Sequence, residues 1–122
     1  GDPDSDVRQW AARNSNLPPE PLSTLARDDD RMVRFRVARN HNTPVGTLTE
    51  LAGDDDAHVR MSVACNPFTP ADVLVSLAGE QFPEIRQAVA RNPSTPAEVL
   101  KLLKADTHWS VRRSAARPPL TT

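Results

Sequence analysis

Residues 85–103 read IRQAVARNPSTPAEVLKLL, and variants of this unit recur along the chain. Apolar residues stand at i, i+4 and i+5 from Ile85, a spacing that predicts one buried face of an α-helix. Asn92 and Pro93 then end this helix, because the residue before a proline avoids the α region. Apolar residues at helical spacing resume beyond Pro96. Each unit therefore predicts two short helices, which must stack because isolated helices below about 12–15 residues are marginal in water.

The start of the second helix carries a signature of its own. Thr95 is expected to be its N-cap, with Pro96 at the first helical position. Glu98 would complete a capping box with Thr95, and Asp72 would do the same with Thr69.

The copies are spaced by 26 residues without insertions, as the step from Val33 to Val59 illustrates. An arginine follows this opening aliphatic residue directly, and an acidic residue precedes each arginine by six positions. Asparagine and leucine rows recur at the same period, so we predict an all-α solenoid of about five two-helix repeats. The rows are Val7, Val33, Val59, Ile85 and Val111; Arg8, Arg34, Arg60, Arg86 and Arg112; Asp2, Asp28, Asp54, Glu80 and Asp106; Asn14, Asn40, Asn66 and Asn92; and Leu22, Leu48, Leu74 and Leu100.

We expect a single repeat domain over residues 1–122, with no linker or second domain. Its first and last repeats are incomplete, which is typical of a segment of a longer array or of an array whose caps are not included. The expected divisions are a partial repeat 1–6, repeats 7–32, 33–58, 59–84 and 85–110, and a partial repeat 111–122.

Composition narrows the classes of function. The formal net charge of −1 argues against bulk electrostatic binding to nucleic acid, unless charge is segregated by face. Cys65 is the single cysteine, which excludes an intramolecular disulfide and makes a reduced, cytoplasmic setting the expected one. No apolar run approaches the roughly 20 residues that span a bilayer, so no membrane partner is expected.

Two readings compete for the arginine row that begins at Arg8. It could form a track for phosphate or carboxylate groups. With about 100° per residue, however, each arginine falls inside the sector bounded by the core positions of its helix. We therefore expect its stem to pack in the core and its head to reach the acidic row. The asparagine row that begins at Asn14 is expected to bond loop backbone.

Positions two, three and six after the opening aliphatic residue (+2, +3 and +6) should point away from the core, at roughly 200°, 300° and 240° on the helix. They vary between repeats, and they hold residue types that are enriched at interface hot spots. The rival reading is a solvated face whose apolar members touch a missing neighbouring repeat. The candidate binding residues are Trp10, Arg13, Phe35, Arg36, Arg39, Met61, Arg91, Arg113 and Arg117.

No catalytic or cofactor signature emerges. The acidic runs 28–30 and 54–56 offer helix N-caps, whereas a calcium loop alternates its ligands around a turn glycine, and Gly53 precedes its run. The histidines occupy unrelated repeat positions, and Cys65 is expected to be a passive residue. Without a nucleophilic triad, a glycine-rich phosphate loop or a zinc pattern, we expect no metal, no cofactor and no enzymatic activity.

The unit Val-Arg-x-x-Val-Ala-x-Asn-Pro-x-Thr-Pro-x-x-Val-Leu-x-x-Leu resembles the leucine-rich repeat variant family, most clearly over residues 59–104. The resemblance implies a right-handed α-α superhelix that mixes α and 3₁₀ helices. Some members carry an iron–sulfur module ahead of the repeats; this chain has no such cysteine-rich segment, so that role does not carry over. The acid–arginine pattern is similar to the structural ladder of HEAT repeats, and by that analogy the first helix of each repeat lines a concave face.

The expected function is a non-enzymatic scaffold that recognises a protein or peptide through this repeat-lined surface. The alternative is nucleic-acid binding through the arginine-lined concave face. A base-excision enzyme on a HEAT-like scaffold is a third reading, which the lack of a catalytic constellation disfavours. A passive spacer or an oligomerisation module remains, and end-to-end self-association is an option because incomplete terminal repeats expose apolar surface.

Overall fold

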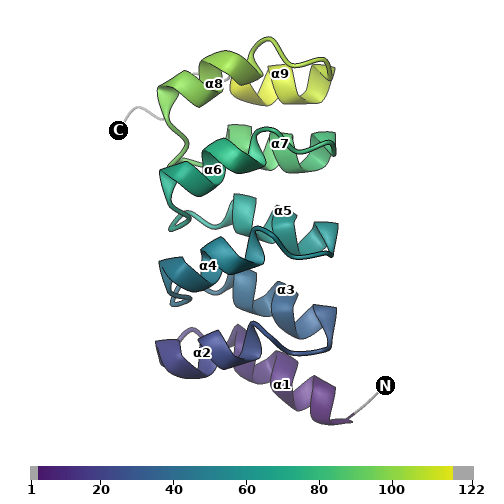
Figure 1. Cartoon of the computed structure of the whole chain (residues 1–122), viewed down its shortest axis with the longest axis vertical. Helices are drawn as coiled ribbons and strands as arrows, with labels where there is room; N and C mark the ends of the chain where they lie inside the picture. Colours follow the sequence, from purple (N-terminus) through teal and green to yellow (C-terminus); the bar gives the residue numbers. More distant parts are fainter. Residues whose placement is uncertain (1–2, 117–122) are drawn as a thin grey trace.

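The computed structural model describes residues 3–116, which form α-helices joined by short turns and no strand. The helices alternate between two layers that run the length of the molecule (Figure 1). The prediction of an all-α solenoid is therefore confirmed. In chain order the helices are α1 (Pro3–Arg13), α2 (Pro19–Leu25), α3 (Arg31–Arg39), α4 (Val45–Leu51), α5 (Ala57–Cys65), α6 (Ala71–Leu77), α7 (Pro83–Arg91), α8 (Ala97–Leu103) and α9 (Trp109–Ala115).

The odd-numbered helices are the first helices of the repeats, and they pack mainly on one another along the stack (Figure 1). Each even-numbered helix packs on the first helix of its own repeat and on that of the next repeat. This arrangement lets helices of seven to eleven residues, too short to be stable alone, bury one face in a continuous core.

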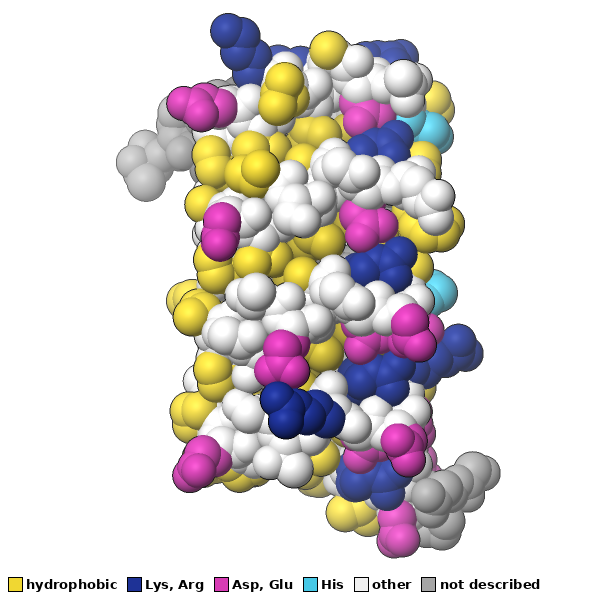
Figure 2. All heavy atoms as spheres, viewed as in Figure 1, with side chains coloured by type: hydrophobic (Ala, Val, Ile, Leu, Met, Phe, Trp, Pro, Cys, Tyr) yellow, Lys and Arg dark blue, Asp and Glu magenta, His cyan; other side chains and the backbone are white. Residues whose placement is uncertain are grey.

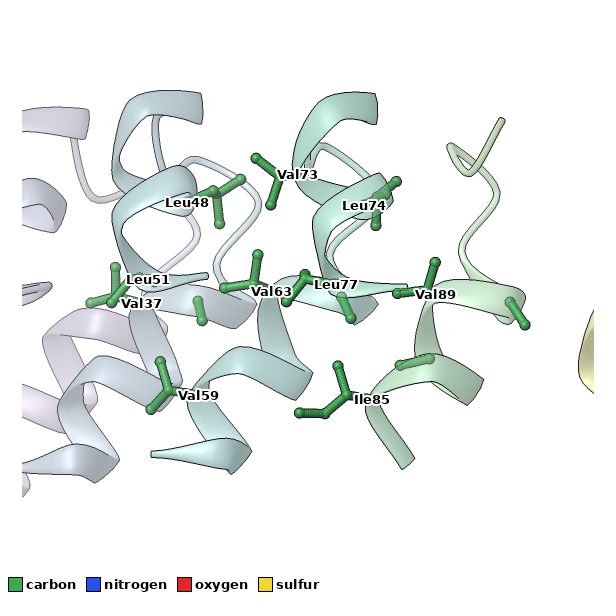
Figure 3. Close-up of a cluster of buried hydrophobic side chains, with 14 of the residues drawn as sticks. Val37, Leu48, Leu51, Val59, Val63, Val73, Leu74, Leu77, Ile85 and Val89 are labelled. Carbon is green, nitrogen blue, oxygen red and sulfur yellow. The ribbon is translucent and has the colours of Figure 1, made fainter. Parts of the chain in front are cut away.

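The core is a thin layer between the two rows of helices. Leu48 and Leu74 of the second helices are fully buried and point toward first-helix residues such as Val63 and Val89 (Figure 3). The predicted leucine row is thus confirmed, although Leu100 is only half-buried. Because most of the facing residues are valine and alanine, the helices approach closely and the core needs no large aromatic side chain.

The first helix of each repeat ends at its asparagine. Asn92 leaves the α region with φ −72° and ψ 126°, as expected for a residue before proline. Asn40 has nearly the same angles, φ −76° and ψ 127°, although His41 follows it. The asparagine therefore ends the helix with or without a proline.

The asparagine side chain joins neighbouring repeats. Asn66 is 2 % exposed, and its Nδ2 donates to the carbonyl oxygens of Ala38 (2.9 Å) and Asn40 (3.2 Å) in the preceding repeat. Its Oδ1 accepts from the backbone N–H of Phe68 at 2.9 Å. Asn92 repeats this pattern one layer on. The prediction that the asparagine row bonds loop backbone is confirmed.

The predicted N-caps of the second helices are wrong. α8 begins after Pro96, whose ψ of 148° is non-helical, and no side chain caps its N–H groups. The hydroxyl of Thr95 instead donates to the carbonyl of Val89 at 2.6 Å, at the end of the preceding helix. Thr69 does the same in its repeat. The reason is that a buried carbonyl at a helix end also needs a donor, so the capping boxes with Glu98 and Asp72 do not form.

The expected 3₁₀ helices are also absent from residues 3–116. The backbone comes closest to a 3₁₀ helix directly after each second helix, where two consecutive N–H groups each donate to the carbonyl three residues earlier. After α4 these are Gly53 to Glu50 and Asp54 to Leu51. Two such bonds tighten one turn and do not make a helix.

The acidic runs cap the first helices, as predicted. The carboxylate of Asp30 accepts from the N–H of Met32, and that of Asp56 accepts from the N–H groups of His58 and Val59. His108 takes this role for α9 by accepting from the N–H of Ser110. Acids at a helix N-terminus also interact favourably with the helix dipole.

A ladder of arginines and acids runs along one edge of the stack, visible as alternating dark blue and magenta side chains in Figure 2. The Nε of Arg34 donates to Asp54 of the next repeat at 2.8 Å, while its Nη1 donates to the carbonyl of Asp28 in its own repeat at 2.8 Å. Arg60 bridges Glu80 and Asp54 in the same way. These guanidinium groups are largely buried, so the expected structural role is confirmed for Arg8, Arg34, Arg60 and Arg86, each of which ties two repeats together. Arg112 is exposed and donates to the carbonyl of Asp106 in its own repeat, and Asp2 of the acidic row lies outside the described residues.

The ladder predicts a dependence of stability on pH. Hydrogen bonding from Arg86 lowers the pKa of Asp106 below its ordinary 3.8, helped by the N–H of His108 and opposed by burial. The stabilisation is therefore fully present above about pH 5, where the carboxyl is ionised in both states, and is lost as pH falls through the folded-state pKa. In urea titrations, Asp106→Asn should destabilise the protein by about 1 kcal/mol at pH 7 and by less at pH 3. An equal difference at both pH values would contradict this assignment.

Candidate binding surface

The candidate residues lie on the outer side of α1, α3, α5, α7 and α9, which we call the first-helix face. Most of their side chains border open hollows, one of which lies against α1 and its following turn, while the others lie between neighbouring first helices. The linings are Trp10, Arg13, Asn14 and Ser15; Arg13, Arg36, Arg39 and Asn40; Met61, Cys65, Glu84, Gln87, Ala88, Arg91, Asn92 and Pro93; and Gln87, Arg91, Trp109, Ser110, Arg113 and Ser114. The candidate Arg117 lies outside the described residues.

The +6 positions form the exposed ridge of this face. Arg13, Arg39 and Arg91 are exposed there, and Cys65 takes the corresponding place on α5. The +2 residues Phe35 and Met61 are half-buried and pack against the core. The prediction that the +2 positions point away from the core is therefore wrong for Phe35 and Met61, although part of each side chain remains accessible.

The +3 positions do not point to solvent, in contrast to the sequence-based expectation. Ser62, Ala88 and Ser114 are 0 %, 8 % and 7 % exposed. They face the preceding first helix, as the bond from Nε of Arg91 to Oγ of Ser114 (3.3 Å) shows. Angles measured on a single helix ignore this neighbour, which covers the +3 side, so small residues are favoured at +3.

Trp10 occupies a +3 position and is 72 % exposed. It lies on α1, which has no neighbouring helix on that side among the described residues. The guanidinium carbon of Arg13 lies 5.9 Å from the centroid of the Trp10 ring. The exposure of Trp10 thus follows from its place at the end of the described stack.

Three arginines gather where α1 meets α3, and we call Arg13, Arg36 and Arg39 the N-terminal arginine cluster. The guanidinium carbons of Arg36 and Arg39 lie 5.3 Å and 5.5 Å from the ring centroid of Phe35. Within residues 3–116 none of the three forms an ion pair with a carboxylate. The Nε of Arg36 is buried without a hydrogen-bond partner. This hollow is therefore positively charged and holds an unsatisfied donor.

The middle of the face is apolar. Met61 and Cys65 of α5 border a hollow with Ala88 of α7, and the charged residues at its rim are Glu84 and Arg91, both on α7. Burial raises the pKa of the Cys65 thiol, against the opposing effects of Arg39 and Arg91. A neutral thiol is a weak nucleophile, in agreement with the passive role expected for this residue.

The C-terminal part combines arginine with an indole ring. Arg91 and Arg113 border the hollow that also contains Trp109, and we call these two residues the C-terminal arginine pair. Trp109 is 61 % exposed and stacks on His108 with 6.1 Å between ring centroids. Sequence reasoning missed Trp109, because it precedes the opening residue Val111 and lies outside the +2, +3 and +6 rows. Its signal was its type, since tryptophan is otherwise present only at Trp10.

The described part of the chain groups no three histidine, cysteine or acidic side chains that could hold a metal ion. The first and third acids of the runs instead serve the ladder and the N-caps. No helix between residues 3 and 116 has both the length and the apolarity required to cross a membrane.

Comparison with models of known protein families identifies the family of this repeat. The family profile described as Leucine Rich Repeat Variant domain matches residues 58–119, which is just over half of the 122-residue chain. A second profile, described as Leucine rich repeat variant, matches residues 6–30. A search of curated proteins finds no match. Together with the stacked helix pairs, these matches show that the chain belongs to the leucine-rich repeat variant family.

Proposed function

We propose that the first-helix face is a non-catalytic surface that binds a segment of another protein. One observation carries the proposal: most of the described arginines outside the ladder gather on this face, beside half-buried Phe35 and Met61 and exposed Trp10 and Trp109. Arginine, aromatic and methionine side chains are enriched at protein interfaces, and arginine and tryptophan dominate binding hot spots.

Charge segregation supports this role. The chain is nearly neutral overall, yet its ladder acids lie at one edge and neutralise the ladder arginines. Of the described residues that line the hollows, Glu84 is the one acid, against the N-terminal arginine cluster and the C-terminal arginine pair. The first-helix face therefore carries net positive charge, and it favours a partner segment with acidic groups.

Cys65 provides a handle for the test, because it is exposed, unique in the chain and central on the face. Peptides selected from a random display library would be measured before and after a bulky maleimide is attached to Cys65. We expect attachment to weaken binding at least about tenfold, since the group covers the central hollow.

The matched control moves the label to the other layer, as Ser76→Cys in a Cys65→Ser background, because Ser76 is exposed on α6. There the same label should leave affinity unchanged. If the selection yields no binding peptide, or if labelling position 76 blocks binding while labelling Cys65 does not, the first-helix face is not the binding surface.

Nucleic-acid binding is the second candidate, and the exposed +6 arginines Arg13, Arg39 and Arg91 favour it. It predicts that affinity for short DNA or RNA falls steeply between about 50 and 200 mM salt, because phosphate contacts release counterions. Fluorescence anisotropy with duplex and single-stranded probes measures this directly. Salt-insensitive or undetectable binding would remove this candidate.

A further inference from the structure

We propose that the bound segment carries two acidic groups separated by an apolar stretch of about five to nine extended residues. This inference rests on the proposed function, and it names the chemistry of the partner. It follows from the order of the hollows along the first-helix face: cationic between α1 and α3, apolar between α5 and α7, and cationic again between α7 and α9.

The N-terminal arginine cluster suits a carboxylate. Arg36 and Arg39 lie against Phe35, which limits their rotamers and leaves the hydrogen-bonding edges of the planar groups for a ligand. Arginine binds carboxylates through two parallel hydrogen bonds, and such charge-assisted bonds are the strong ones.

The C-terminal arginine pair offers a second anionic subsite of different make-up. Arg91 is held by its bond to Ser114, and Arg113 is exposed beside it in the same hollow. Trp109, largely exposed, adds an apolar and hydrogen-bonding surface at the edge. An acidic residue with an apolar neighbour therefore fits this end.

The middle of the face rejects acids. Here α5 contributes Met61 and Cys65 where α3 contributes Phe35 and Arg39. Ala88 forms the floor, and Glu84 stands at the rim. Arg91 of the C-terminal arginine pair also borders this hollow, on its α7 side, while α5 itself contributes no cation to it. A carboxylate placed against Met61 and Cys65 would lose water and would be repelled by Glu84, whereas an aliphatic side chain would bury its surface against Met61.

The spacing follows from the layer distance. Packed helices are about 8–10 Å apart, so α3 and α7, two layers apart, are separated by roughly 16–20 Å, and the two cationic hollows by roughly 24–30 Å. An extended peptide advances about 3.3 Å per residue. These separations correspond to about five to nine residues between the acidic groups.

The same interruption disfavours nucleic acid as the occupant. A duplex carries one charge per about 1.7 Å of its axis without gaps. Across α5, consecutive phosphates would meet Met61 and Cys65 where the neighbouring first helices offer Arg39 and Arg91, and Glu84 lies beside them. Charge in two separated clusters matches a peptide, whose acidic residues can be spaced to fit.

The test uses two fluorescent peptides of identical composition. One has a triplet of glutamates at each end of a central Gly-Leu-Ala-Val-Leu-Ala-Gly segment, and the other has all glutamates contiguous. We expect the separated peptide to bind the chain at least about tenfold more tightly. Glu84→Gln should narrow this difference, because it removes the repulsion that the contiguous acids meet in the middle.

Charge variants locate the subsites. Arg13→Gln with Arg39→Gln, and separately Arg91→Gln with Arg113→Gln, should each weaken the separated peptide about tenfold. The control is Arg27→Gln with Arg31→Gln, which removes two exposed charges away from the face. Thermal unfolding followed by circular dichroism establishes that each variant is folded before binding is measured.

The outcomes separate the two proposals. Equal affinity for both peptides would overturn the proposal of an acidic–apolar–acidic partner segment, and so would equal effects of all three double variants. Neither result would contradict the proposed binding face if the Cys65 label still blocks binding of the selected peptides. Tighter binding of an oligothymidine of similar charge, lost in the same variants, would overturn it in favour of nucleic acid. Failure of the labelling experiment would instead remove the proposed function itself.

Discussion

Replacing Leu74 with alanine is expected to lower the free energy of unfolding by about 3 kcal/mol. Leu74 is fully buried where α6 packs between successive first helices (Figure 3). Its neighbours are mostly valine and alanine on helices already held by the ladders, so they cannot move inward to fill the cavity. Urea unfolding followed by far-UV circular dichroism measures the loss as a lower midpoint.

Val75→Ala is the matched control, because it removes aliphatic groups from the next residue of the same helix, where the side chain is 54 % exposed. Its effect should stay within about 0.5 kcal/mol. Similar losses for the two variants would mean that α6 does not present the described face to the core.

Replacing Asn66 with alanine is expected to cost about 3 kcal/mol of stability, because buried carbonyls left without a donor cost about 1–3 kcal/mol each. The variant removes the donors to Ala38 and Asn40 and the acceptor for the N–H of Phe68. All of these groups lie at the junction of two repeats, where Asn66 is 2 % exposed and water has little access. The same urea titration reports the loss.

Asn14→Ala tests the same repeat position without the neighbouring layer. Asn14 is exposed, and its Oδ1 accepts one bond, from the backbone N–H of Asn16. We expect a loss of at most about 1 kcal/mol there, the usual net value of one hydrogen bond. If Asn14→Ala and Asn66→Ala were equally destabilising, the inter-repeat bonds would contribute nothing beyond the local turn.

The regular rows were predictable because each position has the same environment in every repeat that is covered on both sides. Val7, on α1 at the end of the described stack, is the exception in the aliphatic row: the prediction that it is buried is wrong, since it is 67 % exposed. The period places Val33, Val59 and Ile85 in the core, and the angle between neighbouring positions places Arg34 and Arg60 at its edge with acids in reach. The helix-ending asparagine was predictable because it recurs at the same period; its Oδ1 bonds the local turn, as Asn66 does at the N–H of Phe68, while its Nδ2 bonds the preceding repeat.

Two expectations failed because they treated a helix or a turn in isolation. Thr95 has the local sequence of an N-cap, yet its hydroxyl donates a hydrogen bond to a carbonyl of the preceding helix. The residues around Thr95 do not indicate this partner. Ser62 lies outside the predicted core sector, yet a neighbouring first helix buries it completely. Both outcomes depend on which element lies alongside.

For the candidate surface, the sequence predicted the types and the approximate direction of the side chains. It did not predict their grouping, because residues such as Arg13 and Arg36 are far apart in sequence and meet only when α1 and α3 stack. The apolar interruption around Met61, and the inclusion of Trp109, likewise depend on that stacking.

The sequence by itself predicted the two-helix repeat, the core rows and the arginine–acid and asparagine rows from the 26-residue period, and it predicted the family from the residues of the repeat unit; the family profiles confirm that membership. These features depend on contacts that recur from layer to layer. Only the tertiary structure determined which carbonyl accepts the hydrogen bond of each threonine hydroxyl, and only the neighbouring layer buries the +3 positions. The stacking also divides the arginines of the first-helix face into the N-terminal arginine cluster and the C-terminal arginine pair, with Met61 and Cys65 between them. The physical reason is that burial and charge clustering are properties of packed surfaces, and a surface shared by two helices is specified by neither helix alone.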